Sequence, residues 1–243
     1  MTPERLARIR QMLAMRQPDL TVCLEEVHKP HNLAAIVRTA DAVGVHEVHA
    51  VWPRSNIAKR KGTARGSQNW VGVNLHPDID TAVGQLKAQG MQILATHLSD
   101  TAVDFRRIDY TRPTAILLGQ EKQGITPQAQ ALADQHIIIP MVGMVQSLNV
   151  SVAAAAILYE AQRQRELAGL YGRGCLLSAE EQNRILFEGG HPIFAKICQR
   201  KGLPYPQLGA DGEILADEDW WQKVQMSKAA WSHLDDEDEG LLL

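Results

Sequence analysis

Two polar side chains stand where an apolar strand changes into a helix of small residues, a junction typical of ligand sites. In the segment 137–160, IIIPMVGMVQSLNVSVAAAAILYE, the strand stops at Pro140 and a loop through Gly143 leads into the helix. Ser147 and Asn149 lie where side-chain oxygens cap a helix start, and the free backbone amides there favour acceptor groups on ligands. On this segment alone, simple capping of a packed helix by Ser147 explains the pattern equally well.

The segment GQEKQGIT, residues 119–126, has two glycines with the spacing of a phosphate-binding loop. A nucleoside triphosphate site also needs a lysine directly after the second glycine, and Ile125 stands there instead. No G-x-G-x-x-G pattern follows the first strand, which argues against dinucleotide binding and an ordinary Rossmann-type methyltransferase. Because an apolar strand precedes it, the segment places Gly119 and Glu121 at the carboxyl end of a parallel sheet, where open α/β folds bind ligands.

A third segment, HNLAAIVRTA at residues 31–40, carries an arginine inside an apolar helix. Asn32 can cap this helix, and Arg38 lies about 240° further around it. Such an arginine either pairs with Asp41 or Glu121 or is presented to an anion in a cleft. The segment by itself favours the structural pair.

Two basic regions are candidates for RNA contact. The expected amino-terminal helix, starting at Thr2 and Pro3, carries three arginines on roughly one side with apolar residues between them, which favours RNA contact only slightly. These are Arg5, Arg8 and Arg16. The polar stretch 54–69 predicts a surface loop that can face phosphates, although a solvated charge run fits the pattern better. Its cations are Lys59, Arg60, Lys61 and Arg65.

Short apolar strands alternate with amphipathic helices along most of the chain. This alternation predicts an α/β fold with a mostly parallel sheet and helices on both faces. We expect strands at 21–27, 45–52, 70–76, 91–98, 113–119 and 137–140, and helices at 31–44, 78–90, from 127 and after 149. After Glu160 the chain becomes a charged helical extension, in which Trp220 or Trp221 is expected to anchor it to the body or to a second subunit.

Composition sets broad limits. The 243 residues are 45% hydrophobic and 22% charged, as in soluble globular proteins. The last 33 residues carry a charge of −8, which leaves +5 on residues 1–210 and permits a polyanionic partner. A membrane helix needs about 20 apolar residues in a row, and the sequence has no such run. Three scattered cysteines suit a reducing compartment. We therefore expect a cytoplasmic protein. The histidine pairs predict no metal site.

The three segments together resemble, in order and content, the three motifs of the SpoU/TrmH-type SPOUT methyltransferases. The opening RQPDLTVCLEEVHKPHN and the later FEGGHPIFAK, QRKGLPYP and DEDWW extend the likeness to the branch that modifies guanosine 18 of bacterial tRNA. The resemblance implies methyl transfer from S-adenosyl-L-methionine to the ribose 2′-hydroxyl of a D-loop guanosine in tRNA. It also implies a homodimer and a deep trefoil knot in the carboxyl-terminal part of the domain.

The resemblance also assigns residues. Arg38 matches the family's catalytic arginine, and the supporting polar positions are Asn32, Glu121, Ser147 and Asn149. Positions that enclose the cofactor, mostly through backbone groups and apolar contacts, are Thr96, Leu98, Gly119, Ile139 and Leu148. The expected layout is an amino-terminal extension (1–18), a SPOUT catalytic domain (19–167), a helical extension (168–234) and an acidic tail (235–243).

Two catalytic roles are open for Arg38. A guanidinium normally stays protonated, so it either becomes a base through a neighbouring phosphate and an apolar cleft or, as we prefer, stabilises the developing oxyanion. Two rival functions remain: a ribosomal RNA 2′-O-methyltransferase of the same family, and a catalytically silent RNA-binding protein on this fold.

Overall fold

The computed structural model describes residues 1–27, 29–52, 70–120 and 123–225. The chain divides into two compact units, one of Met1–Met15 with Cys175–Leu243 and the other of Arg16–Gly174. Each unit is described by itself. The basic loop residues Lys59, Arg60, Lys61 and Arg65 and the candidate Glu121 lie outside the described residues. The domain boundaries expected from the sequence stay a prediction.

The larger unit is built on a seven-stranded sheet with the order β3-β2-β1-β6-β4-β7-β5, and all of its strand pairs are parallel. The strands are β1 (Leu20–Glu25), β2 (Glu47–Val51), β3 (Gly72–His76), β4 (Gln92–Thr96), β5 (Val103–Asp104), β6 (Thr114–Leu118) and β7 (Gln135–Ile138). The predicted parallel α/β fold is confirmed. The two-residue strand β5 was not predicted, because two residues are too short to show a period.

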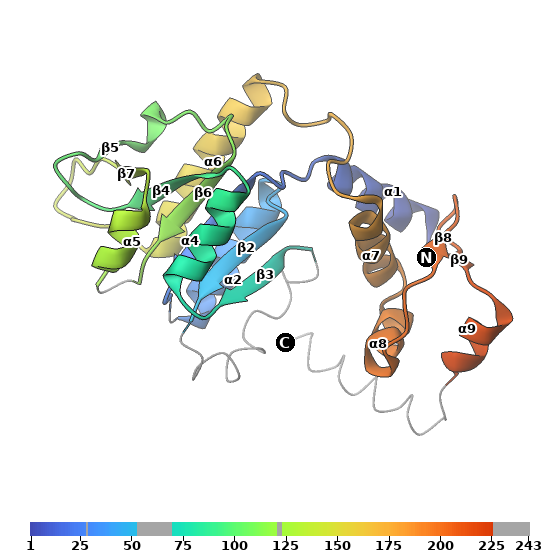
Figure 1. The fold of residues 1–243 in the computed structure, drawn as a ribbon. Helices are drawn as coiled ribbons and strands as arrows, with labels where there is room; N and C mark the ends of the chain where they lie inside the picture. Colours follow the sequence, from blue (N-terminus) through green and yellow to red (C-terminus); the bar gives the residue numbers. More distant parts are fainter. Residues whose placement is uncertain (28, 53–69, 121–122, 226–243) are drawn as a thin grey trace. The chain divides into compact units, whose positions relative to one another are not determined.

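Helices cover both faces of this sheet (Figure 1). One apolar cluster joins the sheet to α2 (Pro30–Ala42) and α6 (Val150–Leu167), and a second joins the opposite face to α4 (Ile79–Ala88) and α5 (Pro127–Leu132). The central strands β1 and β6 are buried along their whole length, as the continuous apolar runs in the sequence predict. Each fully buried large aliphatic side chain stabilises the fold by roughly 1.5–3 kcal/mol.

Arg16 is a buried structural residue. Its side chain is 1% exposed and donates hydrogen bonds to the carbonyls of Val45 (2.8 Å) and Trp70 (2.7 Å) and to Asp41 Oδ1 (2.7 Å). The predicted RNA contact is therefore wrong for Arg16, because its guanidinium is occupied inside the protein.

Arg165, in the last turn of α6, is also fully buried. It donates to Asp19 Oδ1 and Gln17 Oε1, both at 2.7 Å, and to the carbonyl of Tyr110 at 2.9 Å. The end of α6 is thereby bonded to the segments that precede β1 and β6.

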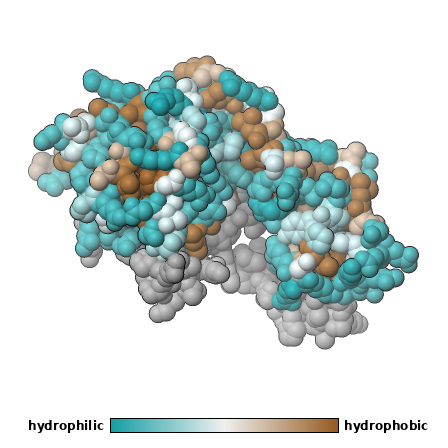
Figure 2. Space-filling view, in the orientation of Figure 1, coloured by the Kyte–Doolittle hydropathy of each residue, from teal (hydrophilic) through white to brown (hydrophobic). Residues whose placement is uncertain are grey.

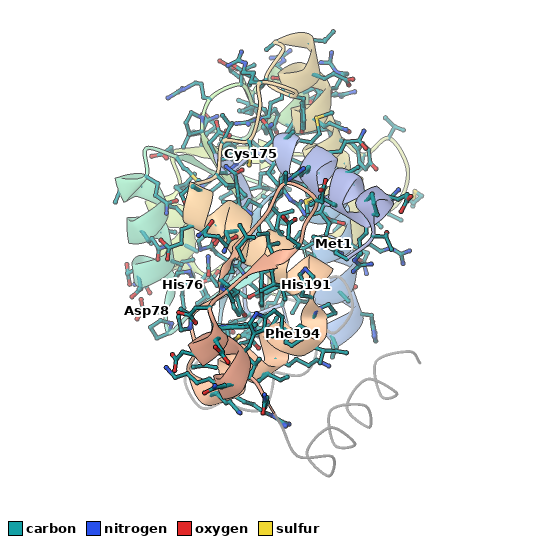
Figure 3. All side chains as sticks on the ribbon, turned by 90° about the vertical axis from the view of Figure 1, so that its right-hand side faces the viewer. Met1, His76, Asp78, Cys175, His191 and Phe194 are labelled. Atoms are coloured by element: carbon teal, nitrogen blue, oxygen red, sulfur yellow. The ribbon has the colours of Figure 1, made fainter. Side chains whose placement is uncertain are left out.

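The smaller unit packs around its own aromatic cluster. It contains α1 (Pro3–Ala14), α7 (Ala179–Gly190), α8 (Pro192–Lys201), the antiparallel pair β8 (Gln207–Leu208) and β9 (Ile214–Leu215), and α9 (Glu218–Lys223). Trp220 is 7% exposed and packs on Phe187 and Phe194 of α7 and α8, while Trp221 is 39% exposed. The expected tryptophan anchor to the body or a second subunit is wrong for Trp220, because it closes the core of its own unit. Figure 3 labels Phe194 and its neighbour His191 in this unit.

None of the described helices is both long and apolar enough to span a membrane.

Candidate active site at the carboxyl edge of the sheet

Four adjacent strands, in the order β1, β6, β4 and β7, deliver almost all of the candidate segments to one edge. Parallel strands end at the same edge, so the start of α2 after β1, Gly119 after β6, Thr96 to Leu98 at the end of β4 and residues 139–149 after β7 lie along it. This carboxyl edge is the candidate active site.

A hydrogen bond joins two of the candidate polar residues across 117 positions of sequence. Asn149 Nδ2 donates to Asn32 Oδ1 at 3.2 Å, while Asn149 Oδ1 accepts the backbone N–H of Ser151 at 2.8 Å and so caps α6. The predicted cap at Asn149 is confirmed. The cap predicted for Asn32 is wrong: Lys29 is the N-cap residue of α2, and Asn32 lies buried within the first turn.

Gly119 is required by a close approach of backbone. The loop after β6 folds back so that Gln120 and Gly124 exchange two backbone hydrogen bonds, of 3.1 and 2.9 Å. A Cβ at Gly119 would lie 2.2 Å from the carbonyl carbon of Gly124, far inside van der Waals contact. Any larger residue therefore forces the two sides of this loop apart, and this requirement explains one glycine of the segment that the sequence singled out.

A buried carboxylate that the sequence did not single out holds the far end of this loop. Glu25, 4% exposed at the end of β1, accepts the N–H of Thr126 at 2.8 Å and its hydroxyl at 2.7 Å. Thr126 in turn caps α5. The next residue, Glu26, has a φ of +52°, a left-handed conformation that few non-glycine residues adopt. The glutamate pair EE in the first strand is the only sequence signal for this arrangement.

The segment after β4 is held by a serine–histidine contact. Thr96 Oγ1 donates to the carbonyl of Leu117 at 3.2 Å, and the hydroxyl of Ser99 lies 2.9 Å from His136 Nδ1 in β7. Between them Leu98 is 81% exposed. Because Thr96 and Ser99 are fixed by hydrogen bonds on either side of it, the exposed Leu98 can contact an apolar part of a ligand.

The loop from β7 to α6 exposes apolar side chains. Val142, Met144 and Val145 are among the most exposed large apolar residues described, whereas Ile139 and Leu148 are half-buried. Ser147 is exposed and does not cap α6, which corrects the prediction, because Asn149 occupies that position. The face drawn in Figure 2 likewise has brown apolar patches within a mostly teal surface.

Arg38 lies apart from this network. It is exposed on α2, eight residues and thus about 12 Å along the axis from the helix start. Asp41, one of its two expected structural partners, forms an ion pair with the buried Arg16. The structure brings Asn32, Asn149 and the three edge segments together and leaves Arg38 presented to solvent.

Arg5 and Arg8 are exposed on α1, and Arg5 Nε donates to the carbonyl of Gly189 at 2.7 Å. The predicted RNA contact is possible for both exposed guanidinium groups and stays a prediction. Among the described residues no three His, Cys, Asp or Glu side chains are grouped closely enough to hold a metal ion.

Comparison with known proteins shows the family of the chain. Residues 19–159 match the model of the SpoU rRNA methylase family, and residues 163–217 match the model of the SpoU rRNA methylase carboxyl-terminal region. The parallel α/β fold agrees with solved SpoU structures. The chain belongs to the SpoU methylase family.

Individual proteins of known sequence or structure are similar to the chain to different degrees. The chain is 67% identical to tRNA (guanosine(18)-2′-O)-methyltransferase of Escherichia coli K12, over 93% of this chain and 99% of that protein. It is similar to the TrmH/SpoU tRNA-modifying enzyme of A. aeolicus (TM-score 0.69, 44% identity, 78% of this chain and 96% of that one). AviRb of Streptomyces viridochromogenes, solved with AdoMet, matches with a TM-score of 0.53 at 29% identity, over 62% of this chain and 59% of that one.

Proposed function

We propose that the chain is a tRNA (guanosine-18-2′-O)-methyltransferase, which transfers a methyl group from S-adenosyl-L-methionine to the ribose 2′-hydroxyl of the D-loop guanosine. The observation that carries this proposal is the 67% identity to the E. coli enzyme over nearly the full length of both chains. The arrangement of the carboxyl edge supports it, because the candidate segments meet there.

The carboxyl edge suits a cofactor with apolar and polar parts. Leu98 supplies exposed apolar surface beside the anchored Thr96, and the half-buried Ile139 and Leu148 supply more. At Gly119 the absent side chain lets backbone groups come close. These residues would hold S-adenosyl-L-methionine, whose sulfonium supplies an activated methyl group when bound.

The polar residues would position the ribose and its developing charge. A ribose hydroxyl is a poor nucleophile: as its oxygen takes the methyl group it must lose its proton, here to solvent water, and S-adenosylhomocysteine would leave. Because Arg38 lies about 12 Å along α2 from the carboxyl edge of its own chain, its planar guanidinium would act at the edge of the second copy in the proposed homodimer. There it would stabilise the oxyanion and hold an adjacent phosphate, since it cannot easily accept the proton itself. Asn32 and Asn149, already bonded to each other, would keep the start of α2 in register with the start of α6. Glu121 and Ser147 complete the proposed polar set.

Three further properties belong to the same proposal. The chain acts as a homodimer in the cytoplasm, and exposed Val142, Met144 and Val145 supply apolar area for a second copy. The carboxyl-terminal part of the sheet domain, expected at 19–167, forms the deep trefoil knot of the SPOUT fold. Support for the knot comes from family membership, because threaded chains are otherwise rare. The exposed Arg5 and Arg8 and the basic loop at 59–65 bind the tRNA backbone.

A ribosomal RNA 2′-O-methyltransferase is the second candidate, because the family that residues 19–159 match is the SpoU rRNA methylase family. One assay separates the two. The purified chain is incubated with labelled S-adenosyl-L-methionine and either unmodified tRNA transcript or ribosomal RNA, and the product is mapped by nuclease digestion and mass spectrometry. A 2′-O-methylguanosine in the tRNA D-loop is expected. Label only in ribosomal RNA would favour the second candidate, and cofactor binding without any transfer would favour the silent RNA-binding protein.

A further inference from the structure

The segment 105–112, here called the arginine platform, is an exposed polar loop that is unusually well fastened. It contains the 3₁₀ turn η1 (Phe105–Arg107) and precedes β6. Tyr110 is fully buried and its hydroxyl donates to the carbonyl of Phe105 at 2.9 Å, which closes the loop on itself. This buried tyrosine fixes the shape of the loop.

The last turns of α6 hold the platform from the other side. Gln164 accepts the N–H of Tyr110 and donates to the carbonyl of Ile108, both at 3.0 Å. Arg165 donates to the carbonyl of Tyr110 at 2.9 Å and, more weakly, to that of Arg112 at 3.4 Å. The backbone that carries the platform's arginines is therefore fixed before any ligand binds, which lowers the entropy cost of binding.

A cavity of about 650 Å³ opens beside the platform, at the edge where β4 and β7 begin. Its charged lining residues are Lys87, Arg107, Asp109, Arg112 and Asp134. This is the amino edge of the parallel sheet, opposite the candidate active site.

The two carboxylates that line the cavity, Asp109 and Asp134, already accept hydrogen bonds within the protein. Asp134 pairs with Lys87 at 3.2 Å and accepts the N–H of Ile93 at 2.7 Å. Asp109 accepts both the hydroxyl (2.6 Å) and the N–H (2.9 Å) of Thr111, and these bonds hold the pKa of Asp109 below its ordinary value.

Two arginines of the platform keep their donors free, and a third does not. Within the described part of the chain, neither Arg107 nor Arg112 makes a side-chain hydrogen bond or an ion pair; each is exposed. By contrast Arg106 donates to both carboxylate oxygens of Asp104, at 2.9 and 2.6 Å, which lowers the pKa of Asp104 to about 2. Free guanidinium forks on a fixed backbone suit the oxygens of a phosphate.

The distance between the candidate active site and the arginine platform sets a minimum size for a ligand that contacts both. Asn149 caps α6 at the candidate active site, and Gln164, which holds the platform, comes fifteen residues later, about 22 Å along the helix. A nucleotide at the active site cannot reach the platform, whereas the body of a folded RNA can.

We infer that the arginine platform is a second RNA-binding site, at which Arg107 and Arg112 hold backbone phosphates of the substrate RNA far from the methylated nucleotide. This inference rests on the proposed function and names how that substrate is held. It makes recognition depend on RNA beyond the reacting loop. The contacts carry no base specificity, because phosphates position an RNA without reading its sequence.

The test compares the double variant Arg107→Gln/Arg112→Gln with the wild-type protein in equilibrium binding to an unmodified tRNA transcript and to an isolated D-arm hairpin. The double variant should bind the transcript about tenfold more weakly and reduce the slope of log affinity against log salt by roughly 1–2, one phosphate for each arginine. Its hairpin affinity, its kcat with saturating transcript and its thermal midpoint should stay unchanged.

The control is Arg106→Gln, which removes one charge from the turn that also carries Arg107, but from a side chain already bound to Asp104. It should change transcript affinity less than twofold. Equal losses in the control and the double variant, equal losses for hairpin and transcript, or unchanged transcript affinity in the double variant would each overturn the inference. Because the readout is binding, it stands apart from the proposed function, which fails if the wild-type protein places no methyl group on the ribose 2′-hydroxyl of the D-loop guanosine.

Discussion

The two edges of the sheet are held in different ways. At the carboxyl edge, side-chain contacts such as Asn149 to Asn32 and Glu25 to Thr126 join segments that end or follow different strands, and apolar residues stand in solvent. At the amino edge two fully buried arginines, Arg16 and Arg165, bond several backbone carbonyls each.

The carbonyls that Arg16 and Arg165 bind belong to the segments that lead into β1, β2, β3 and β6, and helix polarity adds to this difference between the edges. In a parallel α/β unit, helices begin after the carboxyl ends of strands, so their free N–H groups gather at one edge and their free carbonyls at the other. Arginine has five donors and no acceptor, so it satisfies the carbonyl-rich edge and would leave the amide-rich edge unsatisfied. The carboxyl edge is thus left with donors for a ligand, and the amino edge becomes the rigid support.

Arg38→Ala is the change with the largest expected effect, and it tests the chemistry of the carboxyl edge. Single-turnover methyl transfer should fall by about 10³-fold or more, because a preorganised charge that stabilises the transition state is lost. Cofactor affinity by titration calorimetry should stay near normal. Arg38→Lys should also be severely impaired, since lysine keeps the charge and loses the planar fork. Retained turnover in Arg38→Ala would remove this residue from the mechanism.

Arg165→Ala tests the amino edge. The free energy of unfolding in urea should drop by about 3 kcal/mol, because Asp19 and several carbonyls lose a buried partner. Arg163→Ala, two residues earlier, removes an exposed pair with Glu160 and should cost less than about 1 kcal/mol. If the two variants were equally stable, the buried arginine would not be the support that we describe.

Gly119→Ala should affect the carboxyl edge more than its size suggests. The new methyl group meets backbone of Gly124, which cannot rotate away, so the loop must open at a cost of about 1–3 kcal/mol. Titration calorimetry should find weaker binding of S-adenosyl-L-methionine. Gly143→Ala is the control, because a Cβ there has no atom within 4 Å and should leave stability unchanged. Normal cofactor affinity in Gly119→Ala would argue against a cofactor site at this loop.

The smallest effect concerns β2 and β3, the two strands on the side of the sheet away from β4 and β7. His49 Nδ1 of β2 lies 2.8 Å from His76 Nε2 of β3, and burial lowers the pKa of both from 6.5, although nearby Glu47 and Asp78 oppose the shift. The unfolded chain therefore takes up protons before the folded one does, so stability should be full above about pH 6.5 and fall below it. Chemical denaturation at several pH values measures this slope, and His76→Gln should flatten it. An unchanged slope in that variant would assign the pH dependence to other groups.

Sequence predicted the fold because apolar periodicity determines which elements form a parallel sheet and which faces they bury. It also predicted that Gly119 lies at the carboxyl end of a strand and that Asn149 caps a helix, because both depend on neighbouring residues in the chain. It failed for Arg16, because its burial depends on carbonyls at Val45 and Trp70, far along the chain. The contacts of Asn32 with Asn149 and of Glu25 with Thr126 were invisible for the same reason, since spacing along the chain gives no sign of loops that meet in space.

The central claim is methylation of one hydroxyl in tRNA, and a single atom of the substrate tests it most directly. Two otherwise identical tRNAs are prepared, one with guanosine and one with 2′-deoxyguanosine at position 18, and each is incubated with the protein and labelled S-adenosyl-L-methionine. The account predicts one methyl group per guanosine-containing tRNA and none in the deoxy substrate. Equal labelling of both tRNAs would contradict it, because the methyl group would then have another acceptor.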